Sequence, residues 1–160
     1  MEIPGGILHP IILRNTIIPC RKTGLFTTVV DYQDTVEINV YEGERVFTRD
    51  NNYLTTFRLA GLLPRPKGLL DIEITCEIDA NGVLYVTATE TVSRIAAKVT
   101  YFHESGRLSI RQIEEIINSA RFNAAKDDIY KHLAALRSST ETLNTAICPK
   151  AQLSITYSPI

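Results

Sequence analysis

Residues 71–90 read DIEITCEIDANGVLYVTATE, and this stretch decides the fold. Apolar and polar residues alternate in both of its halves, which is typical of half-buried strands. The inward positions are Ile72, Ile74, Cys76 and Ile78 in the first half, and Leu84, Val86 and Ala88 in the second. Asn81-Gly82 lies between the halves, and this pair favours a tight hairpin because both residue types tolerate positive φ. The stretch therefore predicts an antiparallel hairpin with one buried face.

The same signals recur over residues 7–102. VEINVYE, at 36–42, places Val36, Ile38 and Val40 on one face. Turn-forming residues interrupt the pattern at 22–24, 50–52 and 61–68. Short alternating segments at this spacing predict a mainly β fold, a two-sheet antiparallel β-sandwich.

The periodicity changes after Gly106. Ser109 suits a helix N-cap, and Gln112 three residues later completes a capping box. Apolar residues then follow at helical spacing: Ile113, Ile116, Ile117, Ala120, Ala124, Ile129, Leu133 and Leu136. The pattern predicts a helix over 110–137 whose apolar face packs on the sandwich.

Residues 138–160 form a third segment, rich in Ser and Thr and interrupted by Pro149 and Pro159. Two readings stay open for it: a disordered tail, or a strand at QLSITY, 152–157, where apolar residues alternate. The chain thus divides into a β region at 1–106, a helical segment at 107–137 and a divergent tail at 138–160.

The composition restricts the class of protein. The chain has 160 residues, which suits one domain or one domain plus an appendage. Its net charge of −1 favours neither nucleic acid nor membrane as a partner. No apolar run is long enough for a membrane span, and the first residues do not form a signal peptide. Cys20, Cys76 and Cys148 are widely spaced, so we expect free thiols in a reducing compartment.

Local signatures of chemistry are missing from the sequence. His9, His103 and His132 have no neighbours at metal-ligand spacing, so no metal site is expected. Phosphate-binding glycine motifs and nucleophile elbows are also absent. The charged stretch YEGERVFTRDNN, 41–52, is interpreted as a strand end with a bulge or tight bend at Gly43 and a turn at 50–52. We therefore expect a non-enzymatic chain with no catalytic residues.

Several specific strings suggest a family. They are RNTIIP (14–19), YEGERVFTRDNNYL (41–54), LPRPKG (63–68), IEITCEIDANGVLYVTAT (72–89) and SGRLS (105–109). Together they span most of residues 5–137, and they closely resemble the substrate-binding domain of the 70-kDa heat-shock chaperones, the DnaK type. The resemblance implies a β-sandwich that holds extended hydrophobic segments of unfolded polypeptides between loops, followed by a helical lid.

The resemblance also implies features of a longer protein. ATP and Mg²⁺ would bind an ATPase domain that this chain lacks, so no cofactor is expected here. J-domain co-chaperones would be partners of the full-length protein, and the location would be cytoplasmic or nuclear. The role would be protein folding under stress.

The resemblance assigns site residues by position. The peptide-binding set is Met1, Ile3, Pro4, Phe26, Thr27, Thr28, Val29, Gln33, Val36 and Ile38. Pro4 and Val29 would bridge over the bound peptide, and Asp31 and Lys67 would form a lid latch. From the residues alone, Phe26, Val36 and Ile38 are better explained as plain sandwich core; the resemblance reverses that order.

An alternative to peptide binding stays open. The chain would then be a non-catalytic structural or assembly module that self-associates through a sheet edge and the helix. The resemblance begins after the family's first strand, which motivates a hypothesis for residues 152–157. They would replace that strand, or lie in the peptide groove of their own or a neighbouring molecule.

Overall fold

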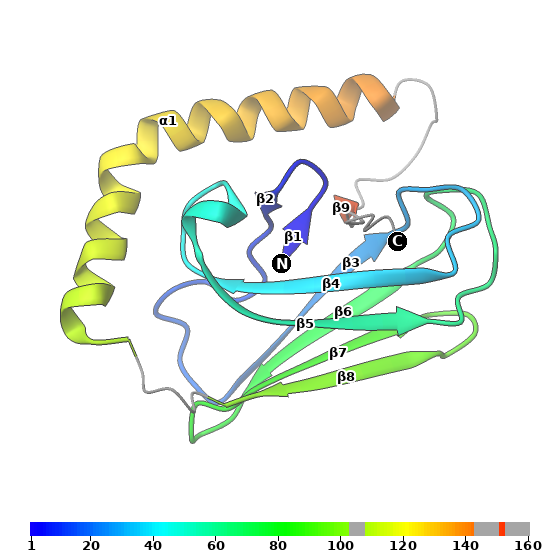
Figure 1. Cartoon of the computed structure of the whole chain (residues 1–160), viewed down its shortest axis with the longest axis horizontal. Coiled ribbons are helices and arrows are strands. Elements are labelled where there is room, and N and C mark those ends of the chain that lie inside the picture. Colours follow the sequence, from blue (N-terminus) through cyan, green and yellow to red (C-terminus); the bar gives the residue numbers. More distant parts are fainter. Residues whose placement is uncertain (103–107, 143–150, 153–160) are drawn as a thin grey trace, which may run out of the picture.

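The computed structural model describes residues 1–102, 108–142 and 151–152 (Figure 1). The strands are β1 (Glu2–Ile3), β2 (Ile7–Leu8), β3 (Cys20–Thr27), β4 (Thr35–Glu42), β5 (Asn52–Ala60), β6 (Ile72–Ile78), β7 (Leu84–Glu90), β8 (Ala96–Tyr101) and β9 (Ala151–Gln152). The helices are a 3₁₀ turn, η1 (Thr48–Asp50), and α1 (Ile110–Thr142).

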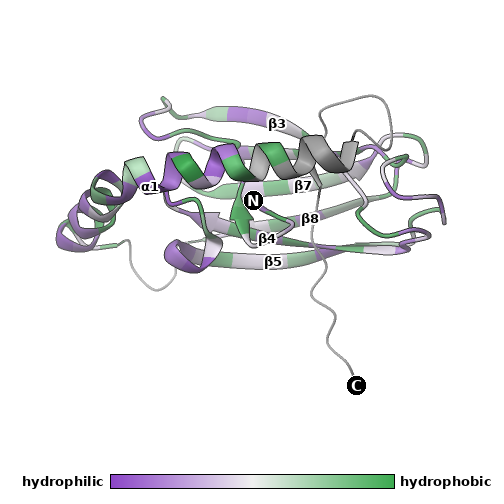
Figure 2. Ribbon diagram, turned by 90° about the horizontal axis from the view of Figure 1, so that it is seen from above, coloured by the Kyte–Doolittle hydropathy of each residue, from purple (hydrophilic) through white to green (hydrophobic). Residues whose placement is uncertain are grey.

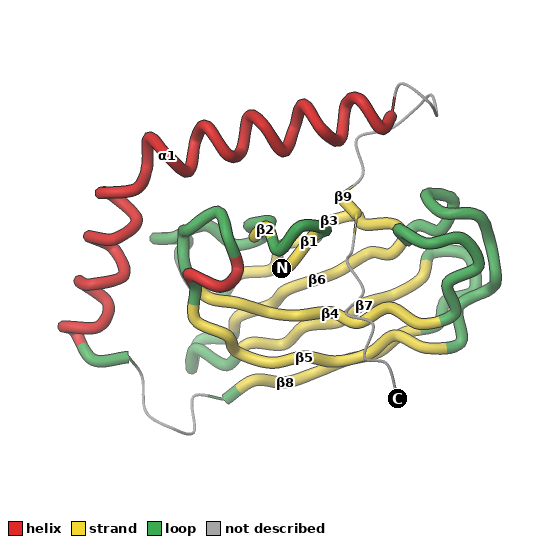
Figure 3. Tube along the Cα trace, turned by 45° about the horizontal axis from the view of Figure 1, so that its top comes forward, coloured by secondary structure: helices red, strands yellow, loops and turns green. Residues whose placement is uncertain are grey.

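The strands form two facing sheets, which confirms the predicted β-sandwich. One sheet has the order β8-β7-β6-β3-β9, and β4 pairs with β5 in the other. β1 and β2 form a small hairpin of their own. Figure 3 shows the strands as stacked layers with α1 running over the top. The pairing is antiparallel except between β3 and β9, which run parallel.

The core lies between the sheets and follows the predicted alternation. The buried cluster includes Phe26, Ile72, Ile74, Cys76, Val86 and Ala88 from one sheet, and Val36, Ile38, Val40 and Leu59 from the other. Ile78 and Leu84, at the hairpin end, are half-buried. Alternate side chains of a strand point to opposite faces, so one apolar face per strand suffices to close this core.

The predicted hairpin is confirmed as β6–β7, with Ile78 opposite Leu84. Its loop differs in detail from the expectation, because only Gly82 of the Asn-Gly pair has positive φ, at 80°. Asp79 organises the loop: its Oδ1 accepts the backbone N–H groups of Asn81 at 2.8 Å and Val83 at 2.9 Å. The connection is thus a longer turn with one left-handed glycine.

Helix α1 begins as predicted and ends later. The capping box is formed, since the backbone N–H of Ser109 donates to Gln112 Oε1 at 2.9 Å and that of Gln112 to Ser109 Oγ at 3.3 Å. The helix continues past residue 137 to Thr142. Figure 1 shows it bending in its first half, so that the remainder crosses above the sandwich.

The expectation that one apolar face of α1 packs on the sandwich is wrong for most of the helix. Ile116 and Ile117 are half-buried, but Ile129 is 60% and Leu136 62% exposed. Figure 2 shows hydrophobic and hydrophilic segments alternating along α1. The bend explains the difference, because a straight-helix pattern does not predict which turns reach the sandwich.

The tail lies mostly outside the described residues. Its described part is β9, which pairs with the end of β3: Ala151 lies opposite Phe26, and Gln152 opposite Thr27. The rest of the predicted strand at 152–157, together with Cys148 and His103, falls outside the described residues. Cys20 and Cys76 are free thiols, half-buried and buried respectively.

Candidate functional site

The ten predicted peptide-binding residues come from three neighbouring segments: the β1 region, the end of β3 with the loop after it, and β4. Met1, Phe26, Thr27, Thr28, Gln33, Val36 and Ile38 are buried, and Ile3, Pro4 and Val29 are half-buried. Phe26, Val36 and Ile38 have no exposed surface and belong to the sandwich core. This burial fits the ordinary-core interpretation, so their role in binding stays a prediction.

Three buried polar atoms lack a hydrogen-bond partner among the described residues. They are Thr27 Oγ1, Thr28 Oγ1 and Gln33 Oε1. The Nε2 of Gln33 does have a partner, since it donates to the carbonyl of Thr35 at 2.8 Å. A buried polar group without a partner costs about 1–3 kcal/mol, and each such group in a native protein calls for an explanation. All three belong to the predicted peptide-binding set.

The loop at 28–34 is tied to the loop at 61–71 by backbone hydrogen bonds. The N–H of Tyr32 donates to the carbonyl of Arg65 at 2.8 Å, and the N–H of Gly68 to that of Thr28 at 3.0 Å. These bonds hold the loop beside β3 in one position. A fixed loop next to a strand end is a suitable wall for a binding groove.

Asp31 and Lys67, the predicted lid latch, lie together in these loops. Asp31 Oδ1 accepts the backbone N–H of Lys67 at 2.9 Å. The carboxylate therefore joins two loops of the sandwich through the backbone of Lys67 and not through its ammonium group. A latch between this pair and the helix stays a prediction.

The helix is docked elsewhere, at the loop between β4 and β5. Arg45 Nε donates to Asp127 Oδ2 at 2.9 Å, and the backbone N–H of Val46 reaches the same oxygen at 3.2 Å. Arg45 also donates to Ser119 Oγ at 3.3 Å and pairs with Asp50 at 3.4 Å. The side chains of Arg45 and Asp127 are only 15% and 6% exposed. Hydrogen bonding to Asp127 raises the pKa of Arg45, so the guanidinium stays protonated.

Aromatic contact extends the docking site. The rings of Phe47 and Tyr130 meet edge to face at 5.1 Å, and the guanidinium of Arg49 lies 4.7 Å from the Phe47 ring centre. Helix α1 therefore docks on the predicted turn YEGERVFTRDNN. The charged residues Arg45 and Arg49 of this turn take part in these docking contacts.

Asn51 stabilises the backbone conformation of this turn. Its Nδ2 donates to the carbonyls of Arg45 at 2.9 Å and Phe47 at 2.8 Å, while its Oδ1 accepts the N–H of Arg45 at 3.0 Å. Gly43 makes room for it: a Cβ on Gly43 would lie 2.1 Å from Asn51 Oδ1, and the φ of 143° also favours glycine. The bend predicted at Gly43 is confirmed.

Sequence reasoning missed Arg45 and Asp127 as partners. One signal was available, because Asp127 follows Ala120 and Ala124 at helical spacing, on the apolar stripe. A carboxylate on a stripe that becomes buried needs a cation or several hydrogen bonds. The position of that cation, 82 residues away along the chain, is a tertiary feature.

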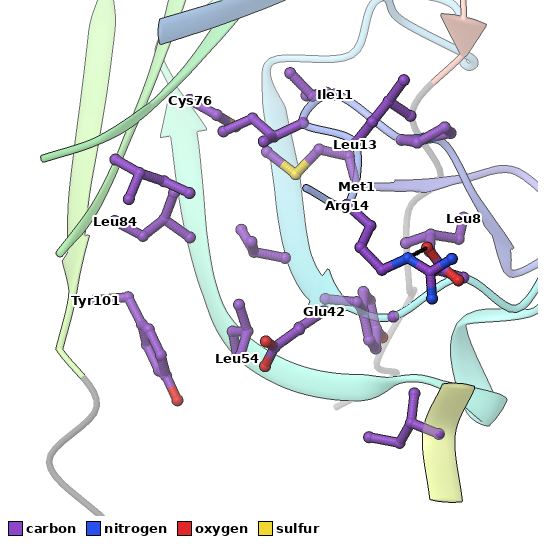
Figure 4. A pocket seen from close by; sticks show the side chains of 18 of the residues that line it. Met1, Leu8, Ile11, Leu13, Arg14, Glu42, Leu54, Cys76, Leu84 and Tyr101 are labelled. Carbon is purple, nitrogen blue, oxygen red and sulfur yellow. Dashed lines mark ion pairs between the residues drawn. The ribbon is translucent and has the colours of Figure 1, made fainter. Parts of the chain in front are cut away.

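A separate apolar cavity of about 400 Å³ lies between the sandwich and the first half of α1. Figure 4 shows Ile11, Leu54, Leu84 and Tyr101 among the side chains around it. Of the predicted peptide-binding residues, only Met1 lines it. Cys76 also faces the cavity, and burial raises the pKa of its thiol to about 11. The thiol is therefore protonated at neutral pH and is a poor nucleophile.

Other chemistry finds little support in the part of the chain that the structure describes. Within it, no three His, Cys, Asp or Glu side chains converge as metal ligands. Burial lowers the pKa of His9, whose ring meets Phe26 edge to face at 5.5 Å. None of the described helical residues forms a segment long and apolar enough to span a bilayer.

The fold and the site together define a two-sheet β-sandwich module with a helix docked on one loop. The profile of the family described as "Hsp70 protein" matches residues 1–153. The chain therefore belongs to the Hsp70 chaperone family, as the sequence strings predicted.

Two curated relatives support this membership. Heat shock cognate 70 kDa protein 3 of Dictyostelium discoideum is 44% identical over 120 residues, which cover 75% of this chain and 19% of that protein. Chaperone protein dnaK of Cyanophora paradoxa is 43% identical over 143 residues, covering 89% of this chain and 23% of that protein. The chain thus spans about a fifth of the length of these relatives.

Proposed function

We propose that this chain is the substrate-binding part of an Hsp70 chaperone and holds extended, apolar segments of unfolded polypeptides. The segment lies along the end of β3 and the loop at 28–34, near β1. Its backbone pairs with backbone groups there, and its apolar side chains contact the region of Phe26, Val36 and Ile38. The chain binds and does not catalyse; ATP hydrolysis and J-domain co-chaperones belong to the whole protein.

The observation that carries the proposal is the group of three buried polar atoms on Thr27, Thr28 and Gln33 that have no partner within the described part of the chain. A bound peptide supplies N–H and C=O groups that partner such atoms. Backbone recognition of this kind reads few side chains, so it suits a binder of many sequences. A few hydrogen bonds of about 0.5–1.5 kcal/mol each and one buried apolar side chain are compatible with micromolar affinity.

Thr27→Val tests the proposal, because valine has nearly the same shape and removes the hydroxyl. We expect the free protein to become about 1 kcal/mol more stable, since a buried unpartnered group is lost. We expect the Kd for a fluorescein-labelled Leu-rich heptapeptide to rise about three- to tenfold, since a bound-state hydrogen bond is lost. Urea unfolding and fluorescence anisotropy measure the two effects.

Thr75→Val is the matched control. Thr75 is also buried, but its Oγ1 lies 3.0 Å from Thr23 Oγ1, so its hydroxyl has a partner. This variant should lose stability and keep the affinity for peptide. If no peptide binds to the wild type or to any variant and the protein self-associates in sedimentation, the assembly-module alternative is correct instead.

A further inference from the structure

The parallel strand β9 marks a contact of the chain with its own binding region. Ala151 and Gln152 pair with Phe26 and Thr27 at the end of β3. Figures 1 and 3 both show β9 beside the tip of β3, below the far half of α1. Phe26 and Thr27 are also two of the predicted peptide-binding residues, so the tail and a bound peptide require the same backbone edge.

Alternate side chains of β3 change from exposed to buried at the point where β9 begins. Arg21, Thr23, Leu25 and Thr27 point to the same side of the strand, and the first three are exposed, Leu25 by 45%. Thr27 breaks the series, with only 3% of its surface exposed. Gln152 is its register partner. The position where the tail pairs with β3 is thus the buried member of an otherwise exposed series.

The sequence of the tail suits this contact. Residues 151–160, AQLSITYSPI, contain no charged side chain. A strand edge with free N–H and C=O groups accepts an uncharged extended segment readily. Residues 143–150 separate α1 from β9 in the sequence.

We infer that the segment beginning at Ala151 is an internal competitor for the peptide-binding edge of β3, and that added peptides bind only after it leaves. This inference rests on the proposed peptide-binding function. A tethered segment acts at an effective concentration in the millimolar range, well above the micromolar concentrations at which free peptides compete. The measured affinity for added peptide equals the intrinsic affinity multiplied by the fraction of molecules with an open edge.

The test compares the full chain with the double variant Ala151→Pro, Gln152→Pro, which removes both backbone donors of β9. Gln152→Ala is the matched control, because it changes the side chain and keeps both N–H groups. Anisotropy with the labelled Leu-rich heptapeptide measures affinity. Successive amides of a strand point to opposite edges, so one of the amides of Phe26 and Thr27 faces β9. Hydrogen exchange of that amide measures the strand contact independently of any peptide.

The expected result is about tenfold tighter peptide binding by the double-proline variant, which corresponds to a tail bound in about nine molecules of ten. Exchange of the amide that faces β9 should be faster in that variant, and Gln152→Ala should match the wild type in both measurements. Equal affinities with measurable binding would overturn the inference and leave the proposed function intact.

Two further outcomes separate the inference from the function it rests on. Faster exchange in the double-proline variant, with no peptide binding by any protein, would support the strand contact and overturn the proposed function, and with it the competition. Protection at Phe26 and Thr27 that depends on protein concentration would overturn the inference, because the strand would then come from a second copy of the chain.

Discussion

At the scale of single residues, buried polar groups differ in whether they have a hydrogen-bond partner among the described residues. Glu90 is the clearest partnered case. Its side chain is completely buried at the end of β7, and it accepts hydrogen bonds from the backbone N–H of Val92 at 2.9 Å and from the N–H and hydroxyl of Ser93. These bonds shape the turn into β8, which also holds Arg94 at a φ of 61°.

The pH dependence of the free energy of unfolding should depend on the ionisation of Glu90. Burial by itself raises the pKa of this carboxyl, but the hydrogen bonds from Ser93 and Val92 outweigh burial, and the pKa is lower than its ordinary value. The folded state therefore favours the ionised form. The resulting stabilisation is complete above the unfolded pKa of about 4.3 and is lost as the pH falls through the lower folded value.

Glu90→Gln should reduce stability at pH 7 and lose less stability than the wild type between pH 7 and pH 3. Urea unfolding at the two pH values measures the difference. Glu77→Gln, on the exposed face of β6, is the control and should follow the wild type. Equal losses on acidification in the wild type and in Glu90→Gln would show that Glu90 does not link protonation to folding.

At the scale of elements, the strands were predictable because their signals are local. Alternation and turn residues lie within a few positions of each other, and the capping box at Ser109 fixed the start of α1 in the same way. The course of α1 was not predictable. Its bend and its contact with Arg45 depend on a loop far away in the sequence, so an apolar stripe predicted a packed face that Ile129 and Leu136 do not make.

In the candidate site too, local sequence predicts some features and tertiary contacts determine others. Positions such as Phe26 and Val36 came from the family resemblance, because the alternation of their strands indicates burial and says nothing of a ligand. The unpartnered atoms of Thr27, Thr28 and Gln33 depend on how two loops meet, which local sequence does not encode.

The docking of α1 gives the prediction at this scale. Arg45→Ala should lower the free energy of local opening of α1 by about 3–5 kcal/mol, because the buried carboxylate of Asp127 is left without its cation. Hydrogen exchange in α1 should accelerate, while exchange in β6 stays unchanged. Lys131→Ala is the control: its pair with Asp128 spans 3.7 Å between side chains that are mostly exposed, and such pairs contribute at most about 1 kcal/mol. Equal effects of the two variants would contradict the docking role.

At the scale of the whole molecule, the sandwich and the helix are stabilised differently. The sandwich has a continuous core shared by both sheets. Helix α1 is attached mainly through the Arg45–Asp127 pair, the Phe47–Tyr130 contact and a few half-buried residues such as Ile117, with an apolar cavity beside them. A helix attached by few contacts opens at a lower free energy than the core does.

Urea unfolding should therefore show two transitions when two probes are compared. The circular dichroism signal at 222 nm, to which α1 contributes most, should begin to fall at lower urea than the amide NMR signals of β6, because the helix detaches before the core opens. Arg45→Ala should move the first transition to still lower urea and leave the second in place. Coincident transitions by both probes, in the wild type and in Arg45→Ala alike, would mean that helix and sandwich unfold as one cooperative unit. Helix α1 would then not detach before the core unfolds.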